Sequence, residues 1–337
     1  MGSSGLRRGV VALTCICFAL SARAQEKKPE AATLAIPGLT LAFSLTFLAE
    51  DLGLWEKHGV KIETREVAGL GSINAAISGS VELAEPSGLS LTRAAARGQK
   101  LLTIVETVDR PVTQLVMRKD IALAAGFDAK APLAERARVL KDRTIAPDSI
   151  NSTNHAFIRL LARQAGYDPE AIRIAPTPPG SMLAAFESKQ IDGYAVSPPW
   201  PLKPVLDGTG VMVASGVEGD PAGFEPFAGT VIVAKPETCA KRTALCAGVA
   251  LAIVDAVSVM LDHPDEATSL LRKRFPTLDE TLLAASVAVM RKATPRHPVV
   301  TAAALENTDR FNIEAGLMRP DEKLPSYDGL FTNDYVR

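Results

Sequence analysis

Six loops rich in glycine, serine, threonine or proline are the parts of this sequence best suited to binding chemistry. Each follows an apolar, strand-like stretch and opens an amphipathic, helix-like stretch. Helix N-termini point unpaired N–H groups and partial positive charge outward, and hydroxyl groups add donors. Loops that meet would therefore bind a carboxylate, a sulfonate, nitrate or a polar neutral group. The candidate ligand-binding residues are Phe43, Ser44, Gly71, Ser72, Pro86, Ser87, Ser152, Thr153, Ser197 and Trp200.

Each of these loops also has a simpler interpretation. Serine and threonine commonly cap helices without binding any ligand, and a single such loop is best explained as a cap. Six loops in the same structural position favour a shared site. Phe43 suits the core as well as a pocket, whereas Trp200 lies among prolines and is expected to face the ligand. His155 either contacts the ligand or, as the pattern favours, faces solvent from a helix.

Motifs of enzymes and metal sites are weak in this chain. Gly69-x-Gly71 resembles the start of a dinucleotide-binding loop, but Asn74 occupies the third glycine position and no acidic residue follows about 20 residues later. No phosphate-binding loop and no G-x-S-x-G motif occurs. The four histidines lack metal-ligand spacing. We therefore expect a protein that is not an enzyme, with no catalytic residues, cofactor or metal.

The elements that must position these loops alternate along the chain. A strand leads to a loop and then to a helix, repeatedly, in both halves of the sequence, and from about residue 236 the chain becomes helical. This alternation predicts an α/β fold with mostly parallel sheets covered by helices. The predicted strands span 33–36, 60–67, 81–85, 101–105, 144–146, 172–175 and 194–196.

The N-terminus and the charge balance indicate export. Two arginines, an apolar run over 9–20 and Ala22-Arg23-Ala24 predict a signal peptide over residues 1–24. The remaining chain has 34 Lys and Arg against 38 Asp and Glu, a formal charge of −4. That balance excludes a basic nucleic-acid surface. No later stretch is expected to insert stably into a membrane, so we predict a soluble monomer in the periplasm.

Cys239 and Cys246 are the only cysteines after the predicted leader. On one continuous helix they would lie roughly 10 Å apart along the axis, which exceeds disulfide reach. A disulfide therefore requires Cys239 to lie before the helix that carries Cys246. The sequence leaves this pairing open.

Several short motifs, in this order, resemble those of a known family. They are Phe47 to Val60 (FLAEDLGLWEKHGV), 75–79 with 81–84, 94–98, Leu183 to Gly193 (LAAFESKQIDG) and His263 to Ala267 (HPDEA). The pattern is similar to the periplasmic substrate-binding proteins of ABC transporters for nitrate, sulfonate and taurine, a family that also includes binders of thiamine precursors. The resemblance covers nearly all of the chain after the predicted leader.

The resemblance implies the type II periplasmic-binding-protein fold, with a ligand cleft between two α/β lobes. Lobe I would span 33–112 plus 228–337, with the C-terminal helices on it, and lobe II 113–227. The implied function is capture of a small solute and its delivery to an ABC transporter permease. Glu85-Pro86-Ser87 and Ser197 to Trp200 depart from the relatives' patterns, so neither nitrate nor taurine carries over. An organic acid or a sulfonate is the expected solute.

Two alternatives fit the same resemblance. Enzymes of the thiamine-pyrimidine synthase and menaquinone-pathway types use this fold, although they act inside cells. A periplasmic subunit that presents a ligand to a sensor would have the same sequence features.

Overall fold

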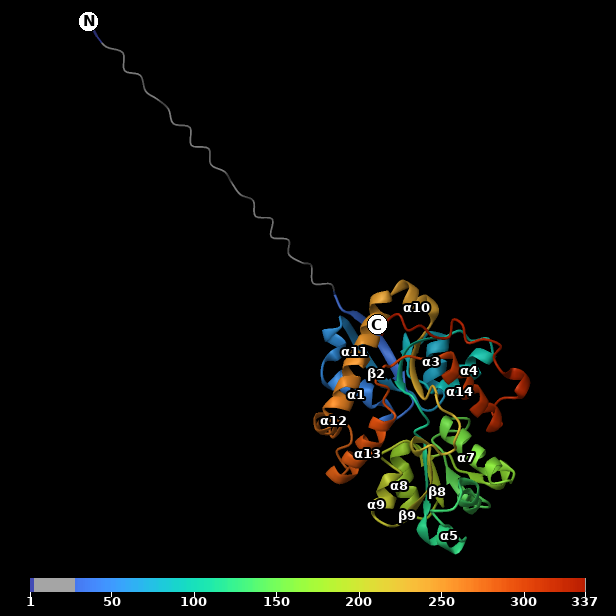
Figure 1. Cartoon of the computed structure of the whole chain (residues 1–337). Helices are drawn as coiled ribbons and strands as arrows, with labels where there is room; N and C mark the ends of the chain where they lie inside the picture. The colour runs from blue at the N-terminus through green and yellow to red at the C-terminus, as the bar shows by residue number, and fades with distance from the viewer. Residues whose placement is uncertain (3–27, 337) are drawn as a thin grey trace.

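The computed structural model describes residues 1–2 and 28–336. The apolar run and the cleavage site of the predicted signal peptide lie outside the described residues. Two five-stranded sheets form the centres of two lobes, one above the other in Figure 1. The first sheet has the order β2 (Val60–Glu66), β1 (Glu30–Ile36), β3 (Leu83–Ala84), β10 (Thr230–Ala234) and β4 (Leu102–Val108). The second has the order β7 (Arg173–Ile174), β6 (Thr144–Ala146), β8 (Gly193–Val196), β5 (Gln114–Arg118) and β9 (Gly210–Ser215).

The sheets are mostly parallel, as predicted, with one antiparallel strand in each. β10 runs antiparallel to β3 and β4, and β5 runs antiparallel to β8 and β9. β5 and β10 are the strands that the chain forms directly after it crosses from the other sheet. Residues 109–113 form the crossing before β5, and residues 216–229 that before β10. The assignment of these strands to two separate sheets supports the predicted lobe boundaries. We propose 33–112 plus 228–337 for lobe I and 113–227 for lobe II.

Helices cover both sheets. In lobe I they are α1 (Ser44–Asp51), α2 (Leu54–Lys57), α3 (Gly71–Ser78) and α4 (Gly88–Ala96). In lobe II they are α5 (Lys119–Ala124), α6 (Leu133–Arg136), α7 (Thr153–Gln164), α8 (Pro179–Glu187) and α9 (Leu202–Leu206). The C-terminal set is α10 (Pro236–Lys241), α11 (Thr243–Asp262), α12 (Pro264–Leu271), α13 (Glu280–Lys292) and α14 (Ala302–Glu314).

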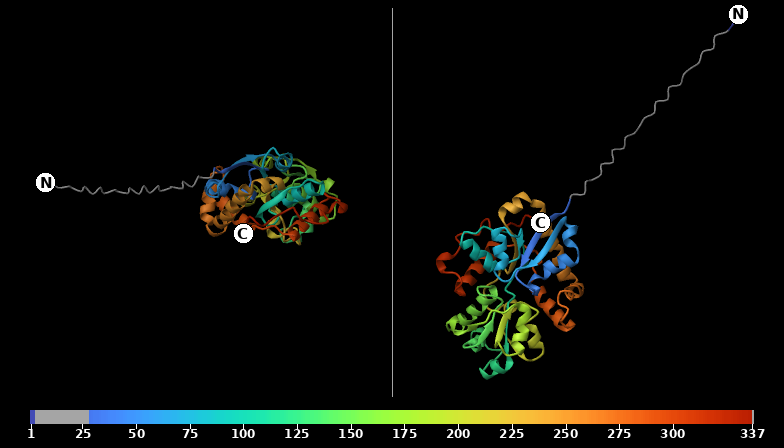
Figure 2. Two further views of the ribbon diagram at one scale, coloured as in Figure 1. Left: turned by 90° about the horizontal axis from the view of Figure 1, so that it is seen from above. Right: turned by 180° about the vertical axis from the view of Figure 1, so that it is seen from behind.

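The C-terminal helices lie mainly on lobe I, seen from two further sides in Figure 2, and two of them also contact lobe II. α11 packs on α1, α2 and the first sheet. α13 also contacts α9, and α14 contacts both α4 and α7. The last helices therefore hold the two lobes against each other in addition to the two crossings.

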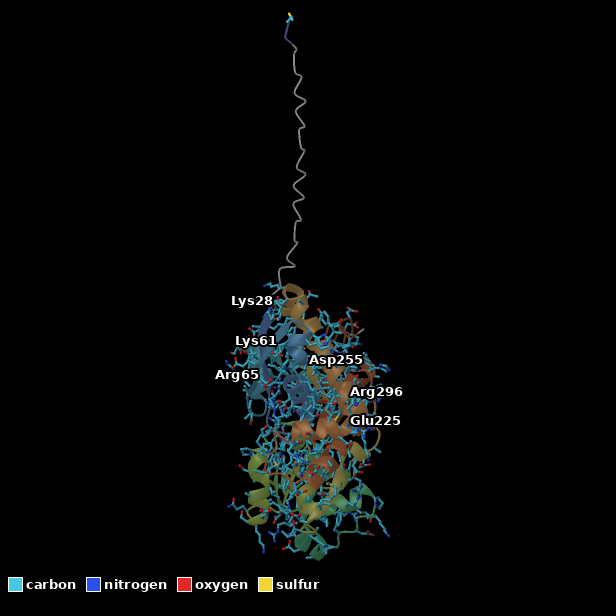
Figure 3. The ribbon with its side chains drawn as sticks, turned by 90° about the vertical axis from the view of Figure 1, so that its left-hand side faces the viewer. Lys28, Lys61, Arg65, Glu225, Asp255 and Arg296 are labelled. Carbon is cyan, nitrogen blue, oxygen red and sulfur yellow. A yellow bond between two sulfur atoms is a disulfide. The ribbon has the colours of Figure 1, made fainter. Side chains whose placement is uncertain are left out.

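β2 shows how the sequence pattern becomes a sheet edge. Val60 and Ile62 are buried, whereas Lys61, Glu63 and Arg65 are exposed, which matches the predicted alternation. Lys61 and Arg65 lie on the outer side of lobe I in Figure 3. Charged side chains on an edge strand oppose pairing with another chain, so the pattern both buries one face of β2 and protects its edge.

α11 corrects the expectation that no later stretch could span a membrane. By length and composition Thr243–Asp262 passes that test, and 56% of its most apolar window is buried inside the protein. A helix that is covered on most sides must be apolar nearly all round. Gly248 permits the close approach, because a Cβ there would lie 2.6 Å from the carbonyl oxygen of His58. Burial in lobe I thus accounts for the composition of α11.

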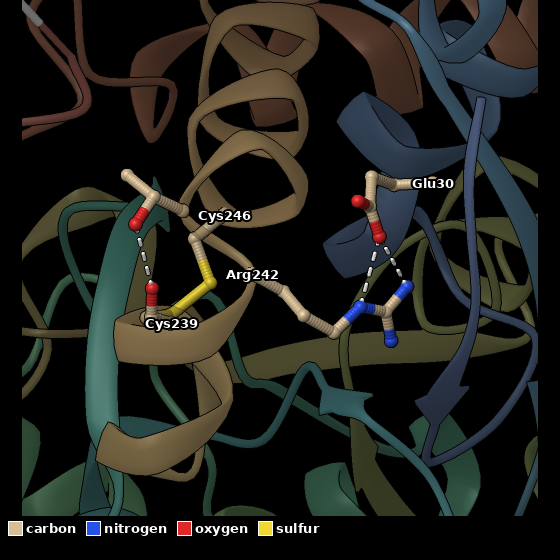
Figure 4. The surroundings of a disulfide bond; sticks show 5 residues. Glu30, Cys239, Arg242 and Cys246 are labelled. Carbon is tan, nitrogen blue, oxygen red and sulfur yellow. Dashed lines mark hydrogen bonds and ion pairs between the residues drawn. A yellow bond between two sulfur atoms is a disulfide. The ribbon is translucent and has the colours of Figure 1, made fainter. Parts of the chain in front are cut away.

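A disulfide joins Cys239 of α10 to Cys246 of α11, with the Cα atoms 5.6 Å apart (Figure 4). The chain leaves helical geometry at Arg242, where φ is −129° and ψ is 54°, so Cys239 lies before the helix that carries Cys246, as a bridge requires. Arg242 also forms an ion pair with Glu30 at 2.9 Å and donates to the carbonyl oxygen of Ala31. The bridge and the ion pair fasten the start of α11 to β1.

Replacing both Cys239 and Cys246 by serine should lower the free energy of unfolding by about 2–3 kcal/mol, because a short closed loop is released in the unfolded chain. Urea unfolding of both proteins measures this difference. Adding a reductant to the wild type should reproduce most of the loss and leave the double variant unchanged. Equal midpoints for the two proteins would contradict a stabilising bridge.

Candidate functional site

A cavity lies between the two sheets, with about 800 Å³ of empty space when its opening to solvent is counted. Its walls come from both lobes and from both crossings. The lobe I residues are Pro37, Gly38, Thr40, Ala42, Phe43, Gly69, Leu70, Ser72, Ile73, Pro86, Ser87 and Ser90. The lobe II residues are Asp148, Ser152, Thr153, Asn154, Pro179, Val196 and Ser197. Residues 110–113 and Phe227 to Thr230 form the part between the lobes. Loops distant in sequence therefore share one enclosed space, which we call the cleft.

Seven of the ten predicted ligand-binding residues line the cleft, and their contact with a ligand remains a prediction. They are Phe43, Ser72, Pro86, Ser87, Ser152, Thr153 and Ser197. Ser44, Gly71 and Trp200 are not among the lining residues. Ser44 is buried at the start of α1, and Gly71 packs closely against Val67. These three residues lie close in sequence to lining residues, but that proximity does not bring them to the cleft wall.

Four helices begin at the cleft: α3 and α4 from lobe I, and α7 and α8 from lobe II. Ser87 caps α4 by accepting from the N–H of Ser90, and Ser152 caps α7 by accepting from the N–H of His155. The capping interpretation therefore holds for these two serines as well. Because each N-terminus carries partial positive charge, the four together favour a negative or strongly polar group in the cleft.

Three hydroxyl side chains on the cleft wall form no hydrogen bond with the described residues, and their oxygen atoms remain accessible from the cleft. Thr40 and Thr230 are 6% exposed and Ser197 is 8% exposed. Their hydroxyl groups can therefore bond to water or to a ligand in the cleft. The Thr153 hydroxyl, also on the wall, is itself buried without a partner, which is costly unless water or a ligand satisfies it. Thr40 and Thr230 were missed by the sequence analysis because they do not open a helix. Thr230 starts an inner strand, and Thr40 lies just before a short 3₁₀ turn at Leu41–Phe43.

Two charged side chains also line the cleft. Arg110, on the first crossing, has its Nε 3.0 Å from Asp109 and its Nη1 3.5 Å from Glu225. Asp148 accepts hydrogen bonds from Ser152 at 2.6 Å and from Asn154 at 2.7 Å. The Asp148 carboxylate is thus held by its own lobe. Because Arg110 is already paired with two carboxylates, the helix starts are the main feature that favours an anion in the cleft.

Glu85 lies beneath the cleft wall and ties three elements together. Its carboxylate accepts from Thr46 of α1 at 2.6 Å and from Thr107 of β4 at 2.9 Å. The Thr107 hydroxyl also lies 3.1 Å from the carbonyl oxygen of Thr230, to which it can donate. Complete burial raises the pKa of Glu85 to about 7, and the two hydroxyl donors only partly oppose that shift. Glu85 therefore positions Pro86 and the start of β10 and does not face the cleft itself.

Trp200 serves as an anchor between the lobes, so the predicted pocket position was wrong. Its indole N–H donates to the carbonyl oxygen of Leu39 at 3.1 Å, and its ring lies 6.2 Å from the ring of Phe275. The neighbouring Pro198 accepts from the N–H of Leu41 at 2.9 Å. Burying the indole in an apolar contact while its N–H finds a carbonyl is the usual solution for tryptophan.

His155 follows neither of the predicted alternatives. It is buried, it does not line the cleft, and its Nδ1 lies 2.9 Å from the backbone N–H of Asn151, which donates to it. Burial lowers the pKa of His155 to about 4. The neutral ring holds Asn151 in a left-handed conformation with φ of 62°. Within the described residues, no group of three or more His, Cys, Asp or Glu side chains is arranged to hold a metal ion.

Trp200→Ala should lower the free energy of unfolding by about 3–5 kcal/mol, because the truncation leaves a cavity between the lobes. Trp200→Phe keeps most of the packing and should cost about 1 kcal/mol for the lost hydrogen bond. Urea unfolding monitored by circular dichroism separates the two variants. An alanine variant as stable as the wild type would remove Trp200 from the interlobe contact.

Glu85→Gln tests the buried carboxyl through the pH dependence of stability. The folded pKa of about 7 exceeds the ordinary value of 4.5, so the folded protein binds more protons than the unfolded chain between these pH values. The contribution of Glu85 is fully present below about pH 4.5 and is lost as the pH rises through about 7.

Between about pH 4 and about pH 8 the wild type should therefore lose about 3 kcal/mol relative to Glu85→Gln. Urea unfolding at several pH values measures the difference, and the exposed Glu187→Gln serves as a control that should follow the wild type. Parallel pH curves for the wild type and Glu85→Gln would contradict a raised pKa.

The chain is similar to a known protein family and to several curated proteins. Residues 25–271 match the model of the NMT1-like family. Among curated proteins, a bicarbonate transport ATP-binding protein from Synechocystis is 26% identical over 184 residues, 51% of this chain and 27% of that protein. A binding protein from Brucella abortus is 26% identical over 159 residues, 45% of this chain and 43% of that protein. The matches thus span less than half the length of these relatives.

Solved structures are similar over nearly the whole chain. The alkanesulfonate-binding protein SsuA from Xanthomonas axonopodis has a TM-score of 0.70 and 19% identity, covering 91% of this chain and 99% of that one. The periplasmic nitrate-binding protein NrtA from Synechocystis has a TM-score of 0.69 and 15% identity, covering 91% and 87%. A protein from Bordetella bronchiseptica has a TM-score of 0.76 and 16% identity, covering 93% and 96%. The likeness confirms the predicted fold class.

Proposed function

Because this chain belongs to the NMT1-like family, we propose that it is a periplasmic solute-binding protein that delivers its ligand to an ABC transporter permease. The observation that carries the proposal is the meeting of four helix starts and three unpartnered hydroxyl groups in one cleft between two lobes. The proposed activity is binding without bond-making. The proposal includes export of the protein, directed by the predicted signal peptide over residues 1–24.

The proposed solute is a small organic acid or a sulfonate. An acidic head would accept hydrogen bonds from the amides at the helix starts and from Ser197 and Thr230. Phe43, Ile73 and Phe227 supply apolar wall for the rest of the molecule. The names of the similar structures, an alkanesulfonate-binding and a nitrate-binding protein, support an oxyanion.

Binding would favour a closed arrangement of the lobes. A ligand shifts this equilibrium only through the contacts that it gains in the closed form. Here those contacts come from both sides, with Thr40, Ser72 and Ser87 on lobe I and Thr153 and Ser197 on lobe II. The closed pair of lobes would then present one continuous surface to the permease, and the released solute would leave unchanged.

A thermal-shift screen against sulfonates, carboxylates, nitrate, amino acids and pyrimidines tests the proposal. A ligand at 100 times its dissociation constant adds about 2.7 kcal/mol to the stability of the folded state. Such a gain raises the melting midpoint by several degrees. Recovery of the bound compound without chemical change is expected, and a converted product would contradict a pure binding role.

Thr230→Val should weaken the affinity for any solute found in that screen by roughly 10-fold, because the variant removes a hydroxyl donor to an ionised group and preserves volume. Ser197→Ala should have a similar effect. Ser188→Ala, on an exposed position of lobe II, is the matched control and should bind as the wild type does. Isothermal titration calorimetry measures all four proteins. Equal affinities throughout would place the solute outside the cleft.

A further inference from the structure

A second cavity lies beside the cleft, on the other side of a shared wall. Leu70, Ile73 and Ser90 line both cavities. The second is formed by α3, the second half of α4, Asn151 of lobe II and the turn after α14 at Gly316. We call it the arginine pocket, because Arg93 and Arg97 line it, together with the amide side chains of Asn74 and Gln99.

Arg93 is a buried cation without an acidic partner. It is 5% exposed, and its Nη2 donates to the carbonyl oxygen of Asn151 at 2.5 Å and reaches the Ser90 hydroxyl at 3.5 Å. Within the described part of the chain no carboxylate forms an ion pair with Arg93. Burial and the charge of Arg97 lower the pKa of Arg93 to about 10, which leaves the guanidinium charged. Buried charges are ordinarily paired.

Two further guanidinium groups lie at or against the walls of this pocket. Arg97 lies one helical turn after Arg93 and is exposed at the end of α4. Arg163, near the end of α7, lies against Gly316, where an added Cβ would collide with its guanidinium. Neither Arg97 nor Arg163 forms an ion pair with a carboxylate of residues 28–336. Two positive charges thus line one pocket, and a third lies against its wall at Gly316, in a chain whose formal net charge is −1.

We propose that the arginine pocket binds an oxyanion, meaning a carboxylate, phosphate or sulfate group. The planar guanidinium fork matches these groups geometrically, and the amides of Asn74 and Gln99 supply further donors. The oxyanion is either a free ion or the second acidic end of a solute that begins in the cleft. The free-ion source rests on the residues of this pocket alone, whereas the second source also rests on the proposed function.

Titration of the full-length protein with inorganic phosphate tests whether the pocket binds a free oxyanion. The same concentration of chloride is the control. Arg97→Gln is the informative variant because this exposed side chain is not needed for folding. It should weaken phosphate binding by about 10-fold. Arg93→Lys keeps the charge but loses the fork, and should also weaken it. Arg173→Gln, an exposed arginine of β7 without an ion pair, should bind phosphate as the wild type does.

A parallel titration compares linear dicarboxylates with monocarboxylates of the same length. If the pocket holds the second end of a solute, a dicarboxylate binds the wild type more tightly, and Arg97→Gln removes that preference. Phosphate or dicarboxylate binding that depends on Arg97 supports the proposal. It is overturned if neither probe distinguishes Arg97→Gln from Arg173→Gln. Thr230→Val separates the two proposals, because it should weaken solute binding in the cleft and leave phosphate binding unchanged.

Discussion

The relative position of the two lobes is the constraint on which the molecule depends, and two short crossing segments help to set it. Residues 109–113 and 216–229 are the only segments of the described chain that run from one sheet to the other. Together with the contacts of α13, α14 and Trp200, they set how two groups of helix starts face each other. An isolated helix start binds an anion weakly in water. When four of them enclose the same small space, away from most of the solvent, their partial charges act together on one group. The cleft is therefore a property of the arrangement and not of any single loop.

The polar side chains near the cleft divide into those that hold the walls and those left without a partner. Glu85 joins α1, β3 and β4, and Asp148 joins its own loop to the start of α7. Trp200 and Leu39 fasten the lobes together. With the walls fixed in this way, the hydroxyl groups of Thr40, Ser197 and Thr230 keep no partner within the described chain and can bond to a ligand or to water.

Sequence periodicity was enough to predict the fold class, the alternation on β2 and seven lining residues, because all three follow from strand–loop–helix repetition. It could not place Trp200, whose burial depends on Phe275 and Leu39, more than 70 and 160 residues away. The position of Thr230 on the cleft wall could not be predicted for a related reason. Which side chains of an inner strand stay accessible depends on what the opposite lobe covers. His155 was misplaced because its partner is a backbone N–H in an unusual conformation. Contacts between distant segments decide the first two positions, whereas a local turn decides that of His155.

The distance between the lobes is the most direct test of closure around a solute. Spin labels at Lys61→Cys on lobe I and Lys119→Cys on lobe II would be attached selectively in protein produced without residues 1–24, which carry Cys15 and Cys17, because Cys239 and Cys246 are already joined. Pulsed electron paramagnetic resonance then measures the distance distribution with and without a solute that calorimetry has shown to bind. The account predicts that saturating solute collapses the distribution to a single, shorter distance. A distribution that stays unchanged while the solute is bound would contradict it.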